Sequence, residues 1–270
     1  MSRLIKIILR PEKKSFIVKA GFPSNQKIKR GDLVIVKTDM GLEVGLVKSS
    51  DYQVKNNKEI NSEISVIRLA TNRDQDKIYE LNIKKTDLLD LFKKKIEFYN
   101  LPMKPIDAYI TFDNKQIIFY FVSETRVDFR ELAKDLIKNL RKKVILRQLG
   151  PRDTAKMIGG YGICGQPLCC FNFLENLGNV IMDMARDQDL EFRGSEKLSG
   201  VCGRLKCCLA YEEEIYNKLR KNMPELGQKV AVGREHGIII NRNILKQEVE
   251  VEFKNQNKKI VSIKDIKLVK

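Results

Sequence analysis

The chain is 270 residues long, which is enough for two or three small domains with separate cores. Its hydrophobic fraction of 43% is typical of a folded globular protein and argues against wholesale disorder. Lys and Arg total 51 against 35 Asp and Glu, which gives a net charge of +16. This excess fits either a nucleic-acid partner or a generally basic surface, and charge alone does not separate the two.

The N-terminal residues and the apolar runs bear on the cellular compartment. Six Lys or Arg side chains fall within the first twenty residues and interrupt any apolar signal segment. The longest apolar run, residues 117–122, is far shorter than the ~20 residues of a membrane span. We therefore expect a cytoplasmic chain without membrane insertion, whose cysteines are thiols or metal ligands rather than disulfides.

Residues 1–62 predict a β-rich N-terminal segment. Short apolar runs at 3–9, 14–20, 33–36 and 42–47 are separated by turns that contain Gly, Asp or Pro. This pattern is typical of a small curled sheet or barrel.

Residues 63–150 predict a ferredoxin-like α/β domain. Asn72 caps a first helix, with Gln75 closing a capping box, and Asp128 with Glu131 caps a second helix. Strands are expected at 64–70, 106–112, 117–122 and 144–149. The order β-α-β-β-α-β is that of the split fold. Its aromatic residues would stack on RNA bases or, more commonly, pack in a core: Phe112, Phe119, Tyr120 and Phe121.

Residues 151–222 form a Cys-rich region of helices and loops, in which 211–220 predicts a charged helix. Residues 223–270 predict a small SH3-like β tail, with strands at 230–232, 237–240, 249–253 and 260–263. The expected fold class is α+β: a ferredoxin-like split β-α-β domain with barrel-like flanking segments and a Cys-rich region.

The cysteines all fall into two copies of the pattern C-G-x-x-x-C-C, spaced 38 residues apart. The candidate ligands are Cys164, Cys169, Cys170, Cys202, Cys207 and Cys208. Thiolates are soft ligands, and four of them satisfy a zinc ion or an iron–sulfur cluster. Adjacent cysteines seldom bind the same metal, so the six divide into four ligands and two that pack, or serve a second site shared with a partner. Buried structural thiols are the alternative.

No hydrolytic constellation accompanies this pattern. The only histidine, His236, lies in the β tail, in a segment separate from the cysteines. Adjacent cysteines also occur in dithiol redox enzymes, but the C-x-x-C signature of a low-pKa thiol is absent. We therefore predict that the chain is not an enzyme.

The segments around the cysteines resemble a known family. They read LRQLGPRD at 146–153, MARDQDL at 184–190 and SGVCGRLKCCL at 199–209. With the Gly31-Asp32 pair and the segment 227–230, this sequence is similar to the bacterial YaaT (RicT) proteins. Those are cell-fate regulators of the stage 0 sporulation type, in the polymerase-suppressor (PSP) C-terminal-domain superfamily.

The resemblance implies a non-catalytic regulatory subunit that carries or shares a [4Fe–4S] cluster. It also implies a complex with small helical partner proteins, acting with the endoribonuclease RNase Y in messenger RNA processing. Sporulation, competence and biofilm formation are the processes affected in that family. The six cysteines carry over as candidate ligands. The alternative is a zinc-stabilised nucleic-acid-binding protein, and the basic charge makes RNA a further expected partner.

Overall fold

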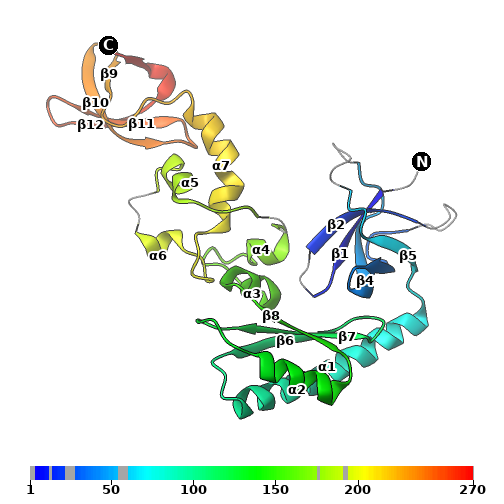
Figure 1. Ribbon diagram of the computed structural model, residues 1–270. Coiled ribbons are helices and arrows are strands. Elements are labelled where there is room, and N and C mark those ends of the chain that lie inside the picture. The colour runs from blue at the N-terminus through cyan, green and yellow to red at the C-terminus, as the bar shows by residue number, and fades with distance from the viewer. Residues whose placement is uncertain are drawn as a thin grey trace. The chain divides into compact units, whose positions relative to one another are not determined.

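The computed structural model describes residues 4–11, 14–21, 28–53, 60–174, 177–190 and 194–269. Its elements divide into two compact units, Met1–Asn176 and Leu177–Lys270, each with cores of its own (Figure 1). Helices and several sheets occur together, which confirms the α+β class. The division of the chain into four parts stays a prediction. No helix in these ranges combines the length and the apolar character that crossing a membrane requires.

The first sheet has five antiparallel strands in the order β2-β1-β4-β3-β5. The strands are β1 (Leu4–Leu9), β2 (Lys14–Lys19), β3 (Leu33–Thr38), β4 (Gly41–Ser49) and β5 (Ser65–Leu69). Its buried face includes Ile5, Ile7, Val18, Val34, Val36 and Val47. The edge strands β2 and β5 approach each other at the Ala20–Val66 bridge, so the sheet curls without closing. Of the two forms that the sequence left open, the structure shows the curled sheet.

Helix α1 (Asn72–Phe98) begins one residue earlier than the sequence predicts, because its N-cap is Thr71 rather than Asn72. The Asp74 N–H donates to Thr71 Oγ1 (3.4 Å), and the Thr71 N–H donates to Asp74 Oδ2 (2.7 Å). The expected Asn72–Gln75 box is therefore wrong. Asp74 is preferred in this position because its carboxylate also accepts from the Arg68 guanidinium, at 3.0 Å from Nη2. This pairing lowers the pKa of Asp74 well below its ordinary value.

The second expected cap is also wrong. Helix α2 (Arg130–Leu140) has Phe129 at its N-cap position, and no side chain accepts a hydrogen bond there. Asp128 instead accepts from the Arg130 backbone N–H (3.1 Å) and from its guanidinium. The Asp128 carboxylate therefore forms a local ion pair with Arg130 and lies one residue before the N-cap.

The second sheet has three strands in the order β6-β7-β8. The strands β6 (Lys104–Ile110) and β7 (Gln116–Val122) are antiparallel, and β8 (Lys143–Gln148) runs parallel to β7 across α2. From β5 onward, the elements follow the expected order β-α-β-β-α-β. One pairing differs from the ferredoxin-like arrangement: β5 pairs with β3, so β8 lies directly beside β7. Val66 of β5 is buried in the core of the first sheet, which explains this pairing.

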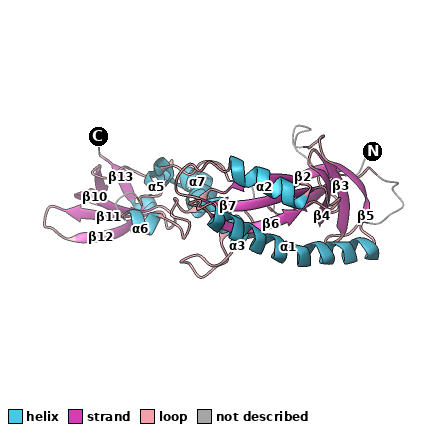
Figure 2. Cartoon of the chain, turned by 60° about the horizontal axis from the view of Figure 1, so that its bottom comes forward, coloured by secondary structure: helices cyan, strands magenta, loops and turns pink. Residues whose placement is uncertain are grey.

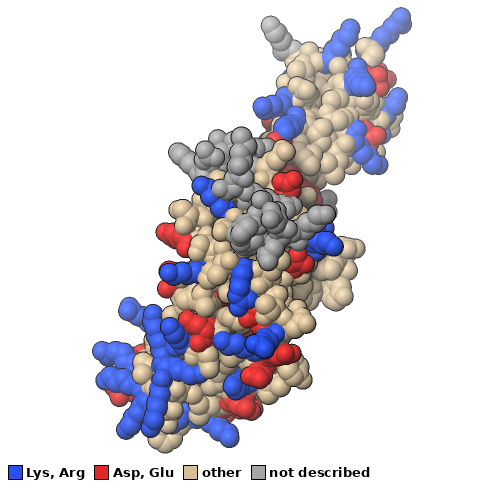
Figure 3. Space-filling view, turned by 90° about the vertical axis from the view of Figure 1, so that its right-hand side faces the viewer, with Lys and Arg blue, Asp and Glu red and all other residues tan. Residues whose placement is uncertain are grey.

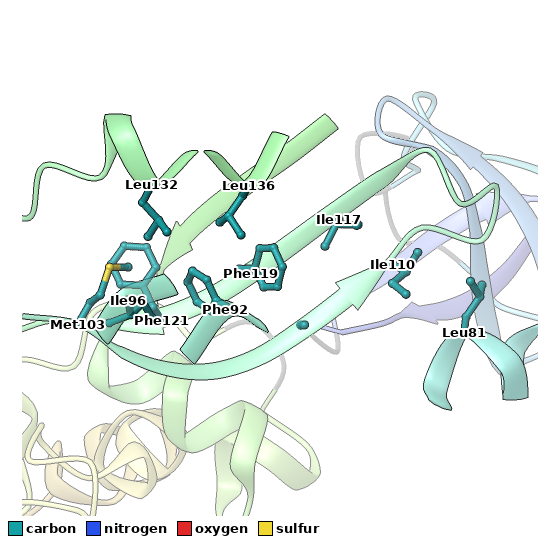
Figure 4. Close-up of a cluster of buried hydrophobic side chains, with 11 residues drawn as sticks. Leu81, Phe92, Ile96, Met103, Ile110, Ile117, Phe119, Phe121, Leu132 and Leu136 are labelled. Carbon is teal, nitrogen blue, oxygen red and sulfur yellow. The ribbon is translucent and has the colours of Figure 1, made fainter. Parts of the chain in front are cut away.

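Both faces of the three-stranded sheet are covered. Helices α1 and α2 cover one face (Figure 2), where Phe92 stacks on Phe119 with 4.4 Å between ring centroids (Figure 4). On the other face, Ile118 and Tyr120 form a cluster with Met157 of α3 (Pro151–Ile158). The aromatic residues considered for base stacking are all core residues: Phe112, Phe119, Tyr120 and Phe121.

The second unit contains α5 (Met182–Asp187), α6 (Ser195–Leu198) and α7 (Cys207–Arg220), followed by an antiparallel sheet. The helix expected at 211–220 in fact begins at Cys207. The sheet order is β12-β11-β10-β9-β13. Its strands are β9 (Lys229–Val232), β10 (Glu235–Asn243), β11 (Glu248–Phe253), β12 (Lys258–Ser262) and β13 (Ile266–Leu268), with the 3-10 turn η3 (Ile263–Asp265). Within the described residues this SH3-sized tail is likewise an open sheet.

Candidate metal centre

The first copy of the cysteine pattern folds into a tight hairpin. The Gly162 N–H donates to the Gln166 carbonyl (2.8 Å), and the Gly165 N–H donates to the Gly162 carbonyl (3.0 Å). These bonds place Cys164 at the tip of the turn. The short helix α4 (Cys169–Asn172) comes directly after it, so the adjacent cysteine pair opens a helix. We call residues 160–170 hairpin 1.

The second copy repeats this geometry 38 residues later. The Gly200 N–H donates to the Arg204 carbonyl (2.8 Å), and the Gly203 N–H donates to the Gly200 carbonyl (2.9 Å). Cys202 takes the tip of the turn, and the second adjacent pair opens α7. We call residues 198–208 hairpin 2. The repeated pattern in the sequence is therefore a repeated structure.

Glycine is favoured at one position of both hairpins and at a second position of hairpin 1. Gly165 and Gly203 both have a φ of +74°, in the left-handed region that favours glycine. A Cβ added at Gly162 would meet the Cys164 Sγ at 3.3 Å, closer than most such contacts. In hairpin 1 the glycine before the turn leaves room for the thiol, whereas a Cβ at Gly200 would make only ordinary contacts, at 3.8 Å and beyond. In both hairpins the glycine after the first cysteine allows the chain to reverse.

All six cysteines are present as thiols, in different surroundings. Cys164 is exposed, Cys170 is buried, and the other four are partly exposed: Cys169, Cys202, Cys207 and Cys208. The pair that opens α7 lies where backbone N–H groups lack helical partners and the helix dipole favours negative charge. Such surroundings favour a thiolate, the form that binds metals.

The hairpins supply the right donor atoms but not a complete site. Among the described residues, no three His, Cys, Asp or Glu side chains gather closely enough to hold a metal ion. Each hairpin carries three thiols, fewer than the four that a tetrahedral zinc or a [4Fe–4S] cluster takes. His236, the only histidine of the sequence, is exposed on β10, in the second unit. The six cysteines therefore remain candidates whose assignment the structure does not test.

A buried arginine holds the second unit together. Arg242 of β10 donates to both carboxylate oxygens of Asp189, at 2.6 and 2.7 Å, and to Glu225 at 2.9 Å. Its side chain is 3% exposed, and the hydrogen bonds to Asp189 raise the pKa of Arg242 above its ordinary value. The MARDQDL segment is thus tied to the C-terminal sheet.

Two neighbouring residues of the same segment secure α7. The Gln188 side chain donates to the Leu209 carbonyl (2.7 Å), just after the cysteine pair of hairpin 2. Asp187 accepts from Arg220 (2.8 Å), in the last turn of the helix. The segment 184–190 was part of the resemblance, but its role in positioning hairpin 2 did not follow from the pattern.

Sequence reasoning missed a buried acid in the first unit. Glu43 of β4 is 3% exposed, and the Tyr109 hydroxyl of β6 donates to its Oε2. Its Oε1 has no hydrogen-bond partner among the described atoms. Burial raises the pKa of Glu43 to about 7. The available signal was the alternation of β4, which puts position 43 on the same face as the buried Val47.

Known proteins match both the sheet domain and the second hairpin. The PSP1 C-terminal conserved region matches residues 64–149, and the third domain of PSP1-like proteins matches residues 179–223. The second match includes hairpin 2, whereas hairpin 1 lies outside both. No solved structure matches the chain significantly.

Two relatives illustrate the range of similarity. The stage 0 sporulation protein YaaT of Bacillus subtilis (strain 168) is 38% identical over 238 residues, which cover 88% of this chain and 86% of that protein. An uncharacterized protein of Schizosaccharomyces pombe is 28% identical over 79 residues, 29% of this chain and 10% of that protein. The extent of the first match, together with the two PSP1 matches, shows that the chain belongs to the PSP1 family as a YaaT-like member.

Proposed function

We propose that this chain is a non-catalytic regulatory subunit that carries or shares a [4Fe–4S] cluster bound by its cysteines. In this proposal it works with small helical partner proteins and with RNase Y in messenger RNA processing, and influences sporulation and related cell-fate decisions. The observation that carries the proposal is the repeated hairpin: every cysteine of the chain lies in one of two copies of a single backbone geometry.

The donor chemistry supports the cluster. Iron–sulfur clusters are held by cysteine thiolates, and the thiols are Cys164, Cys169, Cys170, Cys202, Cys207 and Cys208. When bound, such a cluster supplies one-electron redox chemistry or a site that responds to oxidation. Because one hairpin carries three thiols, the fourth ligand must come from elsewhere. The name of the YaaT relative supports a role in sporulation.

Purification without oxygen, followed by iron, zinc and sulfide analysis, tests the cluster directly. We expect iron and acid-labile sulfide, with broad visible absorption. The double variant Cys164→Ser/Cys202→Ser, which changes the tip of each hairpin, should lose both. Val201→Ala is the matched control, because this exposed side chain precedes Cys202 without a thiol.

Two results would contradict the proposal that the chain binds an iron–sulfur cluster. A colourless protein loaded with zinc would support the alternative, a zinc-stabilised nucleic-acid-binding protein. Iron that is retained in the double variant would exclude these cysteines as ligands. Circular dichroism of each variant separates the loss of metal from the loss of fold.

Recovery of a tagged full-length chain from its native cells tests the proposed complex. We expect small helical proteins and an endoribonuclease to be recovered in fixed ratio with the wild-type chain. The double variant shows whether that assembly needs the cysteines. Recovery of neither class with the wild-type chain would refute the complex, whatever the metal content.

Contact with RNA is proposed from the distribution of charge. Lys and Arg side chains gather at the lower end of the face shown in Figure 3, at the height of α1 and α2 in Figure 1. Near the start of β8, the Lys143 N–H donates to the Lys115 carbonyl (3.3 Å), which brings the two segments together. The exposed cations at the end of α2 and next to the starts of β7 and β8 include Lys115, Lys138, Arg141 and Lys143.

The dependence of RNA affinity on salt measures this contact. Replacing Lys138, Arg141 and Lys143 by Gln should reduce the slope of log K against log salt by about 2, at about 0.7 per phosphate contact. A matched triple variant at the exposed Lys254, Lys258 and Lys259 should leave the slope unchanged. If both triple variants gave the same slope of log K against log salt, the proposal that RNA contacts this surface would be refuted.

A further inference from the structure

The first unit has a partly open cavity of about 450 Å³, within the size range of small-molecule sites. One wall is the outward face of the first sheet, where Val44 and Leu46 of β4 lie opposite to its core face. Ile78 and Leu81, three residues apart on α1, form a second wall. Residues of strand β6 and of the α3–α4 segment form the rest of the cavity lining. These elements can be followed in Figure 1. The body of the cavity is therefore apolar.

The charged side chains of the cavity are mostly cationic. Four basic residues line it, against one carboxylate, Asp107: Arg10, Lys48, Lys85 and Lys156. Lys85 Nζ lies 2.6 Å from Asp107 Oδ1, so this acid is already neutralised. The lining therefore carries more basic than acidic side chains, which favours a ligand with an anionic group.

Hairpin 1 contributes a thiol to the same cavity. Cys170 is buried and lines it, next to Phe171. The Phe171 ring occupies the space of a side chain at Gly159, since a Cβ added there would meet the ring at 2.8 Å. This close contact holds α4 against the end of α3 and so fixes where Cys170 lies. Cys208, its counterpart in hairpin 2, belongs to the other unit and does not line the cavity.

We propose that this cavity binds a small organic anion with an apolar body, and that the bound molecule covers the Cys170 thiol. The apolar walls bind the body, and the basic residues bind a carboxylate or a phosphate group, which share the required chemistry. Ligand binding is thereby coupled to one of the six cysteines. The proposed binding site is formed by the residues that line the cavity, and ligand binding there does not require a bound metal.

Binding of 1-anilinonaphthalene-8-sulfonate to the full-length chain tests the site, because this dye combines an aromatic body with an anion. We expect one saturable site. Lys85→Met should weaken it about tenfold, because the Asp107 carboxylate would lose its partner and its negative charge would repel the anion. Lys84→Met is the matched control, since Lys84 is the neighbouring exposed residue of α1 and does not line the cavity. Val44→Phe, which fills the cavity, should abolish the binding.

A second test uses only the wild-type chain, so its result does not depend on whether a variant folds. The dye should slow alkylation of Cys170 and leave the rate at Cys208 unchanged, as read by mass spectrometry. Displacement by decanoate identifies a carboxylate ligand, and displacement by adenosine monophosphate identifies a phosphorylated one. Unchanged binding in a folded Val44→Phe chain, equal alkylation rates of Cys170 with and without dye, or displacement by neither anion would overturn the proposal.

Discussion

Hairpins 1 and 2 share one backbone geometry but lead into helices of different length. Hairpin 1 leads into the four-residue helix α4, and its second paired cysteine, Cys170, is buried against a cavity. Hairpin 2 leads into the 14-residue helix α7, whose later turns place Tyr216 and Leu219 against the core of the C-terminal sheet. The equivalent thiol, Cys208, is partly exposed.

The difference shows which properties are local. The turn and the glycine conformations recur in both copies, because they depend on residues within the pattern. The burial of each thiol and the elements that hold each hairpin depend on distant residues. We therefore expect the corresponding cysteines of the two hairpins to differ in reactivity, and variants in each unit can test the two hairpins separately.

The largest expected effect comes from removing the anchor of hairpin 2. Arg242→Ala leaves the mostly buried Asp189 without its partner and should destabilise the second unit by about 3 to 5 kcal/mol. Hydrogen exchange of the α7 and β10 amides measures the loss. Labelling of Cys207 and Cys208 should accelerate, while that of the hairpin 1 cysteines should not change.

Lys218→Ala is the control on the same helix, because its ion pair with Glu214 is exposed and screened by solvent and so contributes little to stability. If Arg242→Ala accelerated labelling in both hairpins alike, the two would not be held independently.

The next effect is a pH dependence confined to the first unit. The pKa of Glu43 is about 7 in the fold, against 4.5 without its surroundings. The folded state therefore binds more protons than the unfolded state between these values, and stability falls as pH rises from 4.5 to 7. The difference between the two pKa values of Glu43 corresponds to a loss of about 3 kcal/mol in the free energy of unfolding.

Glu43→Gln keeps an acceptor for the Tyr109 hydroxyl and should remove this dependence. Urea unfolding at several pH values, followed by tyrosine fluorescence, provides the measurement. Glu80→Gln, at an exposed position of α1, should retain the wild-type pH profile. A profile that is the same in all three proteins would show that Glu43 does not titrate in this range.

A smaller effect should be equal in the two hairpins. Ala at Gly165 or at Gly203 would have to adopt the same left-handed φ of +74°, at a cost of about 1 to 2 kcal/mol. Hydrogen exchange at the Gly162 and Gly200 amides should therefore accelerate by similar factors. Gly178→Ala is the control, since an added Cβ there meets nothing within 4 Å. Unequal costs would mean that surrounding contacts, rather than φ, control the turns.

The smallest effect concerns the start of α1 in the first unit. Thr71→Ala removes the hydroxyl that caps the helix and should cost about 1 kcal/mol. Thr71→Ser keeps the hydroxyl and should recover most of the loss in urea unfolding. If Asn72→Ala cost more than Thr71→Ala, the cap would lie where the sequence first suggested.

Much of the secondary structure can be predicted from local patterns. Strands β3, β4, β7 and β11 lie within two or three residues of their expected bounds, because alternating apolar side chains and flanking turns define them. The short helices α3, α4 and α6 were missed, since four to eight residues carry too little periodicity. Among the site residues, the pattern identified the cysteines, and it missed Glu43, Arg242 and the cavity, which join segments far apart in the chain.

The sequence by itself determined the α+β class, the order of the elements from β5 to β8 and the repeated cysteine pattern, because these depend on side-chain periodicity and on the spacing of residues along the chain. Only the tertiary structure decided that β5 pairs with β3, and that Asp189 is held by Arg242. It also decided that Cys170 is more buried than Cys208. The physical reason is that pairing and burial depend on which distant surfaces exclude water together, and local patterns do not encode that choice.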